Sequence, residues 1–135
     1  MQAPDLPTYV TDTHSLYWYR RDARRLSPAA DAAFRLAAAG GARIVVPTIV
    51  VAEFYYLTEK AGYPVVASEL IDHISGSREF TFSELGQSQL EKMEEVTGVL
   101  EMHDRLIAAE ALVHQAPIIS KDAALRAIGV VQVIW

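Results

Sequence analysis

The feature that most constrains the fold is the regular alternation of short β-rich runs with helix-forming segments. Every connection between successive β-rich runs contains at least one helical segment, and parallel strands need such crossovers whereas hairpins do not. The sequence therefore predicts an α/β fold with a parallel sheet and helices on both faces. The expected strands are residues 8–11, 42–47, 78–84, 116–120 and 130–135. The expected helices are residues 12–19, 27–39, 48–60, 65–74, 86–100, 103–115 and 121–128.

Length and composition narrow the class of protein. The 135 residues suit one domain, so we expect a single domain over 1–135 with a disordered extension at 1–7. The absence of cysteine excludes disulfides and thiolate metal sites. No signal peptide or membrane-spanning run is evident, which predicts a cytoplasmic protein without a membrane partner. A net charge of −5 argues against coating nucleic acid through bulk charge, but not against local contacts.

Three aspartates stand where a parallel α/β sheet collects its ligands. Asp12 directly follows the first expected strand, and Asp122 follows the strand at 116–120 after one intervening residue. Asp104 lies at the start of a helix that is apolar around most of its circumference. Helix capping explains each residue taken alone. Because ligands bind at the carboxyl ends of parallel strands, convergence on one site is the alternative.

Glu53 is harder to explain as an ordinary surface charge. It interrupts the run "IVVAEFYYL", and its helical neighbours three and four positions away are all apolar or aromatic. We expect its side chain to face inward rather than toward solvent. A buried carboxylate needs a counter-charge or a metal ion. Pairing with Arg105 is one solution, and a metal site shared with the three aspartates is the other.

Three aspartates and one glutamate form an all-oxygen set of potential ligands. Such a set suits Mg²⁺ or Mn²⁺, which bind a few carboxylates and keep several waters. A metal ion of this kind can activate water and offset the charge of a phosphodiester. These residues therefore indicate phosphoryl chemistry on a nucleic acid.

The same segments resemble the PIN-domain ribonucleases, and most closely the VapC toxins of bacterial toxin–antitoxin modules. The resemblance spans nearly the whole chain and rests on the segments "VTDTHSLYW", "LSPAA", "IVVPTIVVAEFYYL", "HDRLIAAEALVHQAPIISKD" and "VQVIW". It implies a three-layer α/β/α sandwich with a short parallel sheet, and Mg²⁺- or Mn²⁺-dependent cleavage of RNA. It also implies a homodimer and a cognate antitoxin. By position, the metal-binding and catalytic acids are Asp12, Glu53, Asp104 and Asp122.

Other residues are expected to support this site. The resemblance implies that Ser120 holds a carboxylate or a metal-bound water. His14 is expected to pack beside the acids, with contact to substrate phosphate or to the antitoxin as the alternative. Arg105 is expected to orient a carboxylate rather than to bind RNA. Many relatives carry an acid one turn before the third aspartate within an Asp-Pro-x-Asp-Arg pattern. Here "EMHDR" offers Glu101 without the proline, and we expect Glu101 to face solvent.

The segment "RRDARR" is the one dense basic region of the sequence. It is either a solvated loop with local ion pairs or a contact for RNA phosphates near Asp12. The residues concerned are Arg20, Arg21, Arg24 and Arg25.

Other functions remain open at this point. A phosphatase with a nucleophilic aspartate after the first strand usually needs a second acid two residues later, where this chain has His14. A phospho-receiver module needs an aspartate after a central strand, and residues 43–50 contain none. A housekeeping PIN nuclease without an antitoxin, or a PIN fold kept only for binding, are the remaining alternatives.

Overall fold

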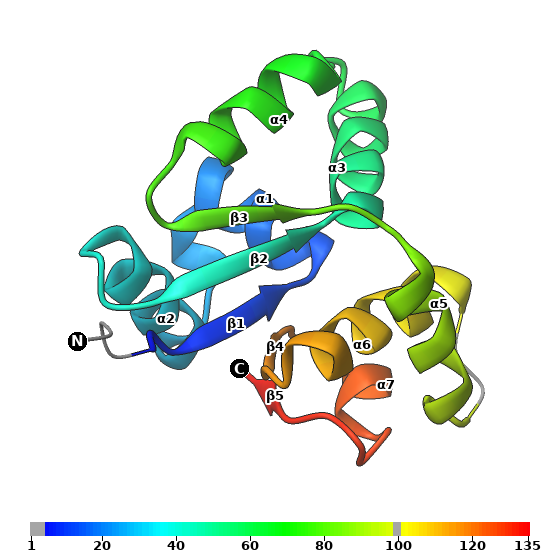
Figure 1. The fold of residues 1–135 in the computed structure, drawn as a ribbon. Coiled ribbons are helices and arrows are strands. Elements are labelled where there is room, and N and C mark those ends of the chain that lie inside the picture. Colours follow the sequence, from blue (N-terminus) through cyan, green and yellow to red (C-terminus); the bar gives the residue numbers. More distant parts are fainter. Residues whose placement is uncertain (1–4, 99–100) are drawn as a thin grey trace.

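The computed structural model describes residues 5–98 and 101–135, which form a parallel sheet with helices on both faces (Figure 1). Within those residues five strands pair in the order β3-β2-β1-β4-β5. They are Thr8–Thr11 (β1), Arg43–Pro47 (β2), Phe80–Ser83 (β3), Ile118–Ile119 (β4) and Val133–Ile134 (β5). All four pairings are parallel. The predicted three-layer α/β/α architecture is confirmed.

Helices occupy every connection between the strands. The α-helices are Thr13–Arg21 (α1), Pro28–Ala38 (α2), Thr48–Lys60 (α3), Ala67–Gly76 (α4), Gln87–Lys92 (α5), Met102–His114 (α6) and Ala123–Arg126 (α7). Two short 3-10 helices, Ala23–Arg25 (η1) and Met93–Glu95 (η2), follow α1 and α5. In the part of the chain that the structure describes, no helix is long and apolar enough to cross a membrane.

The strand order creates a switch point between β1 and β4. The chain moves outward from β1 to β2 and β3, and then returns to the other side of β1 for β4 and β5. Right-handed crossovers therefore place α1–α4 on one face of the sheet and α5–α7 on the other. The register pairs Val10 with Ile118 and Thr11 with Ile119. Ligands of open α/β sheets bind in the crevice beyond the strands at such a point.

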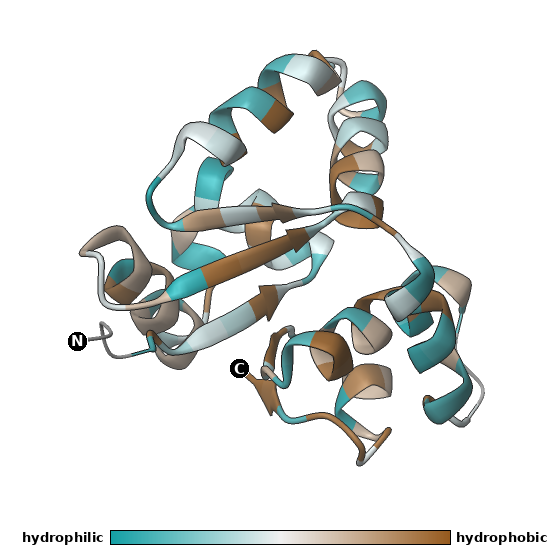
Figure 2. Cartoon of the chain, viewed as in Figure 1, coloured by the Kyte–Doolittle hydropathy of each residue, from teal (hydrophilic) through white to brown (hydrophobic). Residues whose placement is uncertain are grey.

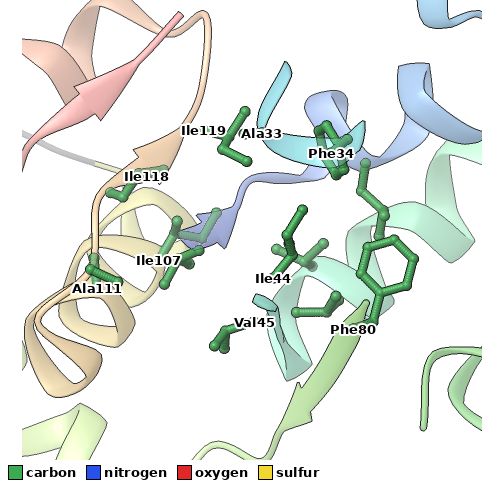
Figure 3. Close-up of a cluster of buried hydrophobic side chains, with 14 of the residues drawn as sticks. Ala33, Phe34, Ile44, Val45, Phe80, Ile107, Ala111, Ile118 and Ile119 are labelled. Atoms are coloured by element: carbon green, nitrogen blue, oxygen red, sulfur yellow. The ribbon is translucent and has the colours of Figure 1, made fainter. Parts of the chain in front are cut away.

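Apolar side chains from both helical layers meet the central strands. The strand β2, next to the central strand β1, becomes strongly apolar after Arg43, and its residues Ile44 and Val46 are fully buried (Figure 2). Phe34 of α2 and Ile107 of α6 approach the sheet from opposite directions (Figure 3). Burying such side chains contributes about 1.5–3 kcal/mol each, which makes the sheet a rigid platform for the residues at its edge.

The boundaries of α2 follow from its sequence. The hydroxyl of Ser27 accepts a hydrogen bond from the backbone N–H of Ala30, and Pro28 occupies the first turn. After the helix, Gly40 adopts a φ of +87°, a conformation that few other residues tolerate. The residues at the two ends of α2 therefore set where this helix begins and ends.

The segment 86–100 differs from the helix that its sequence predicts. The helix α5 ends at Lys92, and η2 and an irregular stretch through Gly98 follow. Val96 is fully buried in an extended conformation, and Gly98 has a φ of +116°. Burial of Val96 thus overrides the helical pattern. Residues 99 and 100 of the predicted helix lie outside the described residues.

The last two strands are shorter than their sequences indicate. The run at 116–120 forms a strand only over Ile118–Ile119, although the backbone N–H of Ser120 still donates a hydrogen bond to the carbonyl of Ile134 (3.1 Å). The predicted helix at 121–128 shrinks to α7, which Asp122 caps. At the amino end, residues 1–4 of the predicted extension lie outside the described residues. The carbonyl of Pro7 accepts a hydrogen bond from the backbone N–H of Arg43 (2.9 Å).

Candidate active site

Asp12 occupies the junction between β1 and α1 and is almost fully buried. Its Oδ1 accepts a hydrogen bond from the backbone N–H of Ser15 (2.9 Å), so the residue caps α1 as the sequence allowed. Its Oδ2 accepts a hydrogen bond from the hydroxyl of Ser120. The hydroxyl of Ser15 in turn donates to the carbonyl of Ile119 (3.1 Å). Capping and a place at the switch point are therefore compatible in one side chain.

Asp122 is joined to Asp12 through Ser120. The Ser120 hydroxyl, which donates to Asp12, also accepts a hydrogen bond from the backbone N–H of Asp122 (3.0 Å). Oδ1 of Asp122 caps the short helix α7 by accepting from the N–H of Ala124 (2.8 Å). Ser120 therefore contacts the carboxylate of Asp12 and the backbone of Asp122, which ties the two positions together.

Glu53 projects from α3 toward the amino end of α1. Its Oε1 accepts a hydrogen bond from the hydroxyl of Thr13 at 2.7 Å, and its side chain is 31% exposed. Glu53 therefore points into a solvent-accessible cavity rather than into the apolar core. Its neighbour Tyr56 is 68% exposed, so the stripe around Glu53 is less uniformly inward than the sequence suggested.

The sequence suggested that Arg105 pairs with Glu53 or orients another acid. In the structure Arg105 does neither. Its guanidinium donates from Nη2 to the carbonyl of Met93 (2.6 Å), on the side of α6 that packs against α5 and η2. Asp104 precedes it in the first turn of α6, whose amino-terminal cap is Glu101. Consecutive side chains of an α-helix point in directions about 100° apart. Asp104 therefore faces the cavity, whereas Arg105 faces the neighbouring helix.

All four predicted acids line one cavity of about 590 Å³. Asp12 and Asp122 come from the sheet edge, Glu53 from α3 and Asp104 from α6. Residues that lie far apart in the sequence thus meet at the switch point between β1 and β4. The complete lining is Asp12, Thr13, His14, Trp18, Glu53, Glu101, Asp104, Ile107, Lys121 and Asp122.

The crowding of carboxylates alters their acidity. The pKa of Asp104 is raised from 3.8 to about 6, first by burial and then by the negative charges of Asp122, Glu101, Glu53 and Asp12, in that order of importance. Burial also raises the pKa of Asp12, although the hydrogen bonds from Ser120 and Ser15 oppose this rise. The cavity therefore holds more negative charge than its own surroundings compensate.

The sequence did not predict that Glu101 and His103 lie beside the four acids. Glu101 is 58% exposed, in keeping with the expected solvent contact, yet it also lines the cavity. His103, which the sequence analysis did not single out, places Nδ1 2.8 Å from Oε1 of Glu101 and 3.5 Å from Oε2 of Glu53. The three-residue spacing of Glu101 and Asp104 on one helical turn was the available signal.

His14 lies at the cavity wall, with its ring 5.7 Å from that of Trp18. A second hollow of about 280 Å³ adjoins the first, because the two share Thr13, His14 and Glu53. It extends along α3 to Lys60 and His103. The acidic centre is thus bordered by groups that can carry positive charge.

The arginines of "RRDARR" divide between different surroundings. Arg25 lies with Cζ 5.1 Å from the ring centroid of Trp18, which itself lines the acidic cavity. Arg24 forms an exposed ion pair with Asp22 (3.0 Å), and Arg20 lines a separate hollow beside α4. Arg21 is exposed at the end of α1. The local ion pair expected for a solvated loop therefore describes Arg24, whereas Arg25 lies near the acidic cavity.

The donor set fits a hard divalent cation. Its carboxylate oxygens and hydroxyls are the ligands that Mg²⁺ and Mn²⁺ prefer, and a cation would relieve the repulsion recorded in the pKa of Asp104. Within residues 5–98 and 101–135, no three potential ligands lie close enough together to form a finished metal-binding group. Mg²⁺ usually binds through one or two carboxylates and several waters, which such spacing accommodates.

Comparisons with known proteins identify the fold and the family to which it is similar. The model of the PIN domain matches residues 9–131, which include all the acids described above. No curated protein sequence matches the chain.

Several solved structures share the fold. VapBC2 from Rickettsia felis, solved bound to a DNA fragment from the promoter, has a TM-score of 0.71 at 15% identity, over 93% of this chain and 96% of the other. A toxin–antitoxin complex from Klebsiella pneumoniae has a TM-score of 0.66 at 19% identity, over 94% and 96%. FitAcB from Neisseria gonorrhoeae has a TM-score of 0.61 at 16% identity, over 93% and 95%. At these identities the likeness is one of fold.

Proposed function

This chain belongs to the PIN domain family, and on that premise we propose that it is a metal-dependent endoribonuclease and the toxin of a toxin–antitoxin pair. One observation carries the proposal, namely that Asp12, Glu53, Asp104 and Asp122 line a single cavity at the switch point of the sheet. Helix capping accounts for Asp12 and Asp122 separately, but it does not require four carboxylates to share one cavity.

In this proposal the four acids hold Mg²⁺ or Mn²⁺. Such an ion, when bound, supplies an activated water and offsets the negative charge of the phosphodiester. Asp12 and Asp122 hold their positions through the common hydroxyl of Ser120, whereas Thr13 fixes Glu53 from the side of α1. The partly exposed wall of the cavity leaves room for substrate.

An RNA strand needs positive charge to approach a protein with a net charge of −5. Lys121 and His14 line the acidic cavity, and Lys60 lines the hollow beside it. These side chains support RNA as the substrate because they flank the acids on two sides.

The test of nuclease activity is cleavage of a structured RNA by the purified chain in Mn²⁺, compared with Asp12→Asn and Asp104→Asn. We expect the wild type to cleave the RNA. The cleavage rate of each variant should be lower by a factor of about 100 or more, because each substitution removes a charged ligand. Asp72→Asn is the matched control, since Asp72 is exposed on α4. EDTA should stop the wild-type reaction. Equal cleavage by wild type and both site variants would sink the nuclease proposal.

The toxin assignment is supported by the toxin–antitoxin complex from Klebsiella pneumoniae and by VapBC2, which have the same fold. We expect expression of the wild-type chain to arrest bacterial growth, and Asp104→Asn to remove the arrest. Co-expression of a short DNA-binding protein from the adjacent reading frame should restore growth. RNA cleavage without growth arrest would favour the housekeeping nuclease instead.

We also propose that the chain forms a homodimer, as the similarity to VapC toxins implies. Light scattering on the purified protein should give twice the chain mass of 14.9 kDa. A monomer across the micromolar range would contradict this part of the proposal and leave the nuclease untouched.

A further inference from the structure

Trp18 is the large aromatic side chain in the wall of the acidic cavity. It lies on α1, six residues after Asp12, and shares the cavity lining with Lys121 and Asp122. The side chain is only partly buried, so its indole borders both the core and the cavity. An aromatic surface therefore adjoins the carboxylates at which a phosphodiester would react.

Two cations from different segments gather over this indole. The guanidinium carbon of Arg25 in η1 lies 5.1 Å from the ring centroid, and Nζ of Lys121, between β4 and α7, lies 5.9 Å from it. Both residues are exposed. The ring attracts both cations through its quadrupole, so it concentrates positive charge at one margin of an otherwise acidic cavity.

Neighbouring rings fix the orientation of the indole. The ring of His14 lies 5.7 Å away at an interplanar angle of 49°, and that of Trp135 lies 5.7 Å away at 57°. Neither neighbour is stacked parallel to Trp18. For a planar ligand to stack on the indole, one of the two exposed cations has to move aside, and that cation then lies beside the ligand.

We propose that Trp18, Arg25 and Lys121 form a subsite for one nucleotide of single-stranded RNA next to the scissile phosphodiester. The base stacks on the indole, and the two cations contact the phosphates on either side of that nucleotide. Stacking on aromatic side chains beside a positive groove is how proteins hold single strands. A base inside a duplex is already stacked on both faces, so the subsite selects unpaired RNA. This inference rests on the proposed nuclease function.

The segment "RRDARR" contains its own control for the subsite. Arg24 is adjacent to Arg25 in the same 3-10 helix, but its side chain is 92% exposed and pairs with Asp22. Arg25→Ala and Arg24→Ala therefore remove the same charge from neighbouring positions. An effect of long-range charge alone would be equal in the two variants.

Binding is measured without cleavage in the Asp104→Asn variant, by the anisotropy of a labelled single-stranded oligoribonucleotide. We expect Trp18→Leu and Arg25→Ala to weaken binding roughly tenfold, and Arg24→Ala to change it less than twofold. Trp18→Phe should keep part of the affinity, because it retains a smaller aromatic face. Circular dichroism checks that each variant is folded, and Arg25 lies on the surface, where its removal leaves the core intact.

Stacking itself is read from Trp18 fluorescence in a chain that also carries Trp135→Phe, since these are the two tryptophans of the sequence. The oligoribonucleotide should quench the emission, whereas an abasic strand of equal charge should not. Equal quenching by both strands, or unchanged affinity in Trp18→Leu and Arg25→Ala, would overturn the subsite and leave a protein contact as the role of this surface. RNA binding through Trp18 in a wild-type chain that cuts nothing would instead refute the nuclease alone.

Discussion

The hydroxyl of Ser120 donates a hydrogen bond to Oδ2 of Asp12 across the junction between β4 and β1. The two residues are 108 positions apart in the chain, and both are buried. The same hydroxyl accepts a hydrogen bond from the backbone N–H of Asp122 (3.0 Å). One small side chain at the switch point therefore sets the spacing of two acids that come from different strands.

Ser120→Ala should cost about 1–3 kcal/mol in the free energy of unfolding, because it leaves a buried Asp12 oxygen without its donor. It should also raise the pKa of Asp12 further, since the lost bond opposes the effect of burial. Urea unfolding at pH 7.5 measures the cost. Ser68→Ala, at an exposed position of α4, is the control. Equal unfolding midpoints for the two variants would show that the bond does not matter.

Asp104→Asn should stabilise the metal-free protein near neutral pH. The folded-state pKa of Asp104 is raised to about 6 from 3.8, so the folded chain binds this proton more tightly than the unfolded chain does. Ionised Asp104 therefore destabilises the wild type above pH 6, and the effect disappears as the pH falls to about 4. Thermal unfolding in EDTA should show a higher Tm for Asp104→Asn at pH 8 and no difference at pH 4. A lower Tm at pH 8 would contradict the charge crowding.

Thr13→Val should weaken Mn²⁺ binding by about tenfold without disrupting the fold. The variant keeps the shape of the side chain but removes the hydroxyl that donates to Oε1 of Glu53 at 2.7 Å. Side chains that orient metal ligands typically contribute 10–100-fold to metal affinity. Calorimetric titration with Mn²⁺ measures the loss. Thr8→Val, at the start of β1, should bind as wild type does, and equal weakening in both would remove the role of Thr13.

Glu110→Ala should destabilise the chain by about 2–4 kcal/mol without lowering the activity of the folded molecules. Glu110 is buried on α6, where its Oε1 accepts from the hydroxyl of Ser83 and lies 2.8 Å from Nε2 of His114. Removal leaves these partners unsatisfied at the contact between α6 and the end of β3. Denaturant unfolding and RNA cleavage at low temperature separate the two effects. Glu91→Ala, exposed on α5, is the control, and a matching loss of activity in Glu110→Ala would place Glu110 in the site.

The sheet and the position of the acids could be predicted from the sequence because they depend on local pattern and on a topological rule. Apolar runs such as residues 44–47 form buried strands, and helical crossovers make those strands parallel. Asp12 and Asp122 then fall at the carboxyl ends of neighbouring strands. The expectation needed no knowledge of side-chain contacts.

Other features depend on tertiary contacts that no local pattern contains. Arg105 donates its hydrogen bond to the carbonyl of Met93 because α5 and η2 pack against that side of α6. The helix predicted over 86–100 is cut short because Val96 is buried in the core. The place of His103 between Glu101 and Glu53 required the relative positions of α3 and α6.

The most direct test of the account is calorimetric titration of the purified chain with Mn²⁺ at pH 7.5. The central claim is that the cavity shared by Asp12, Glu53, Asp104 and Asp122 binds a divalent cation. We predict binding by wild type and by Asp72→Asn, and at least tenfold weaker binding by Asp12→Asn and Asp104→Asn. Unfolding cannot explain the last result if Asp104→Asn is the more stable protein. Absence of Mn²⁺ binding by wild type, or equal binding by all four proteins, would contradict the claim.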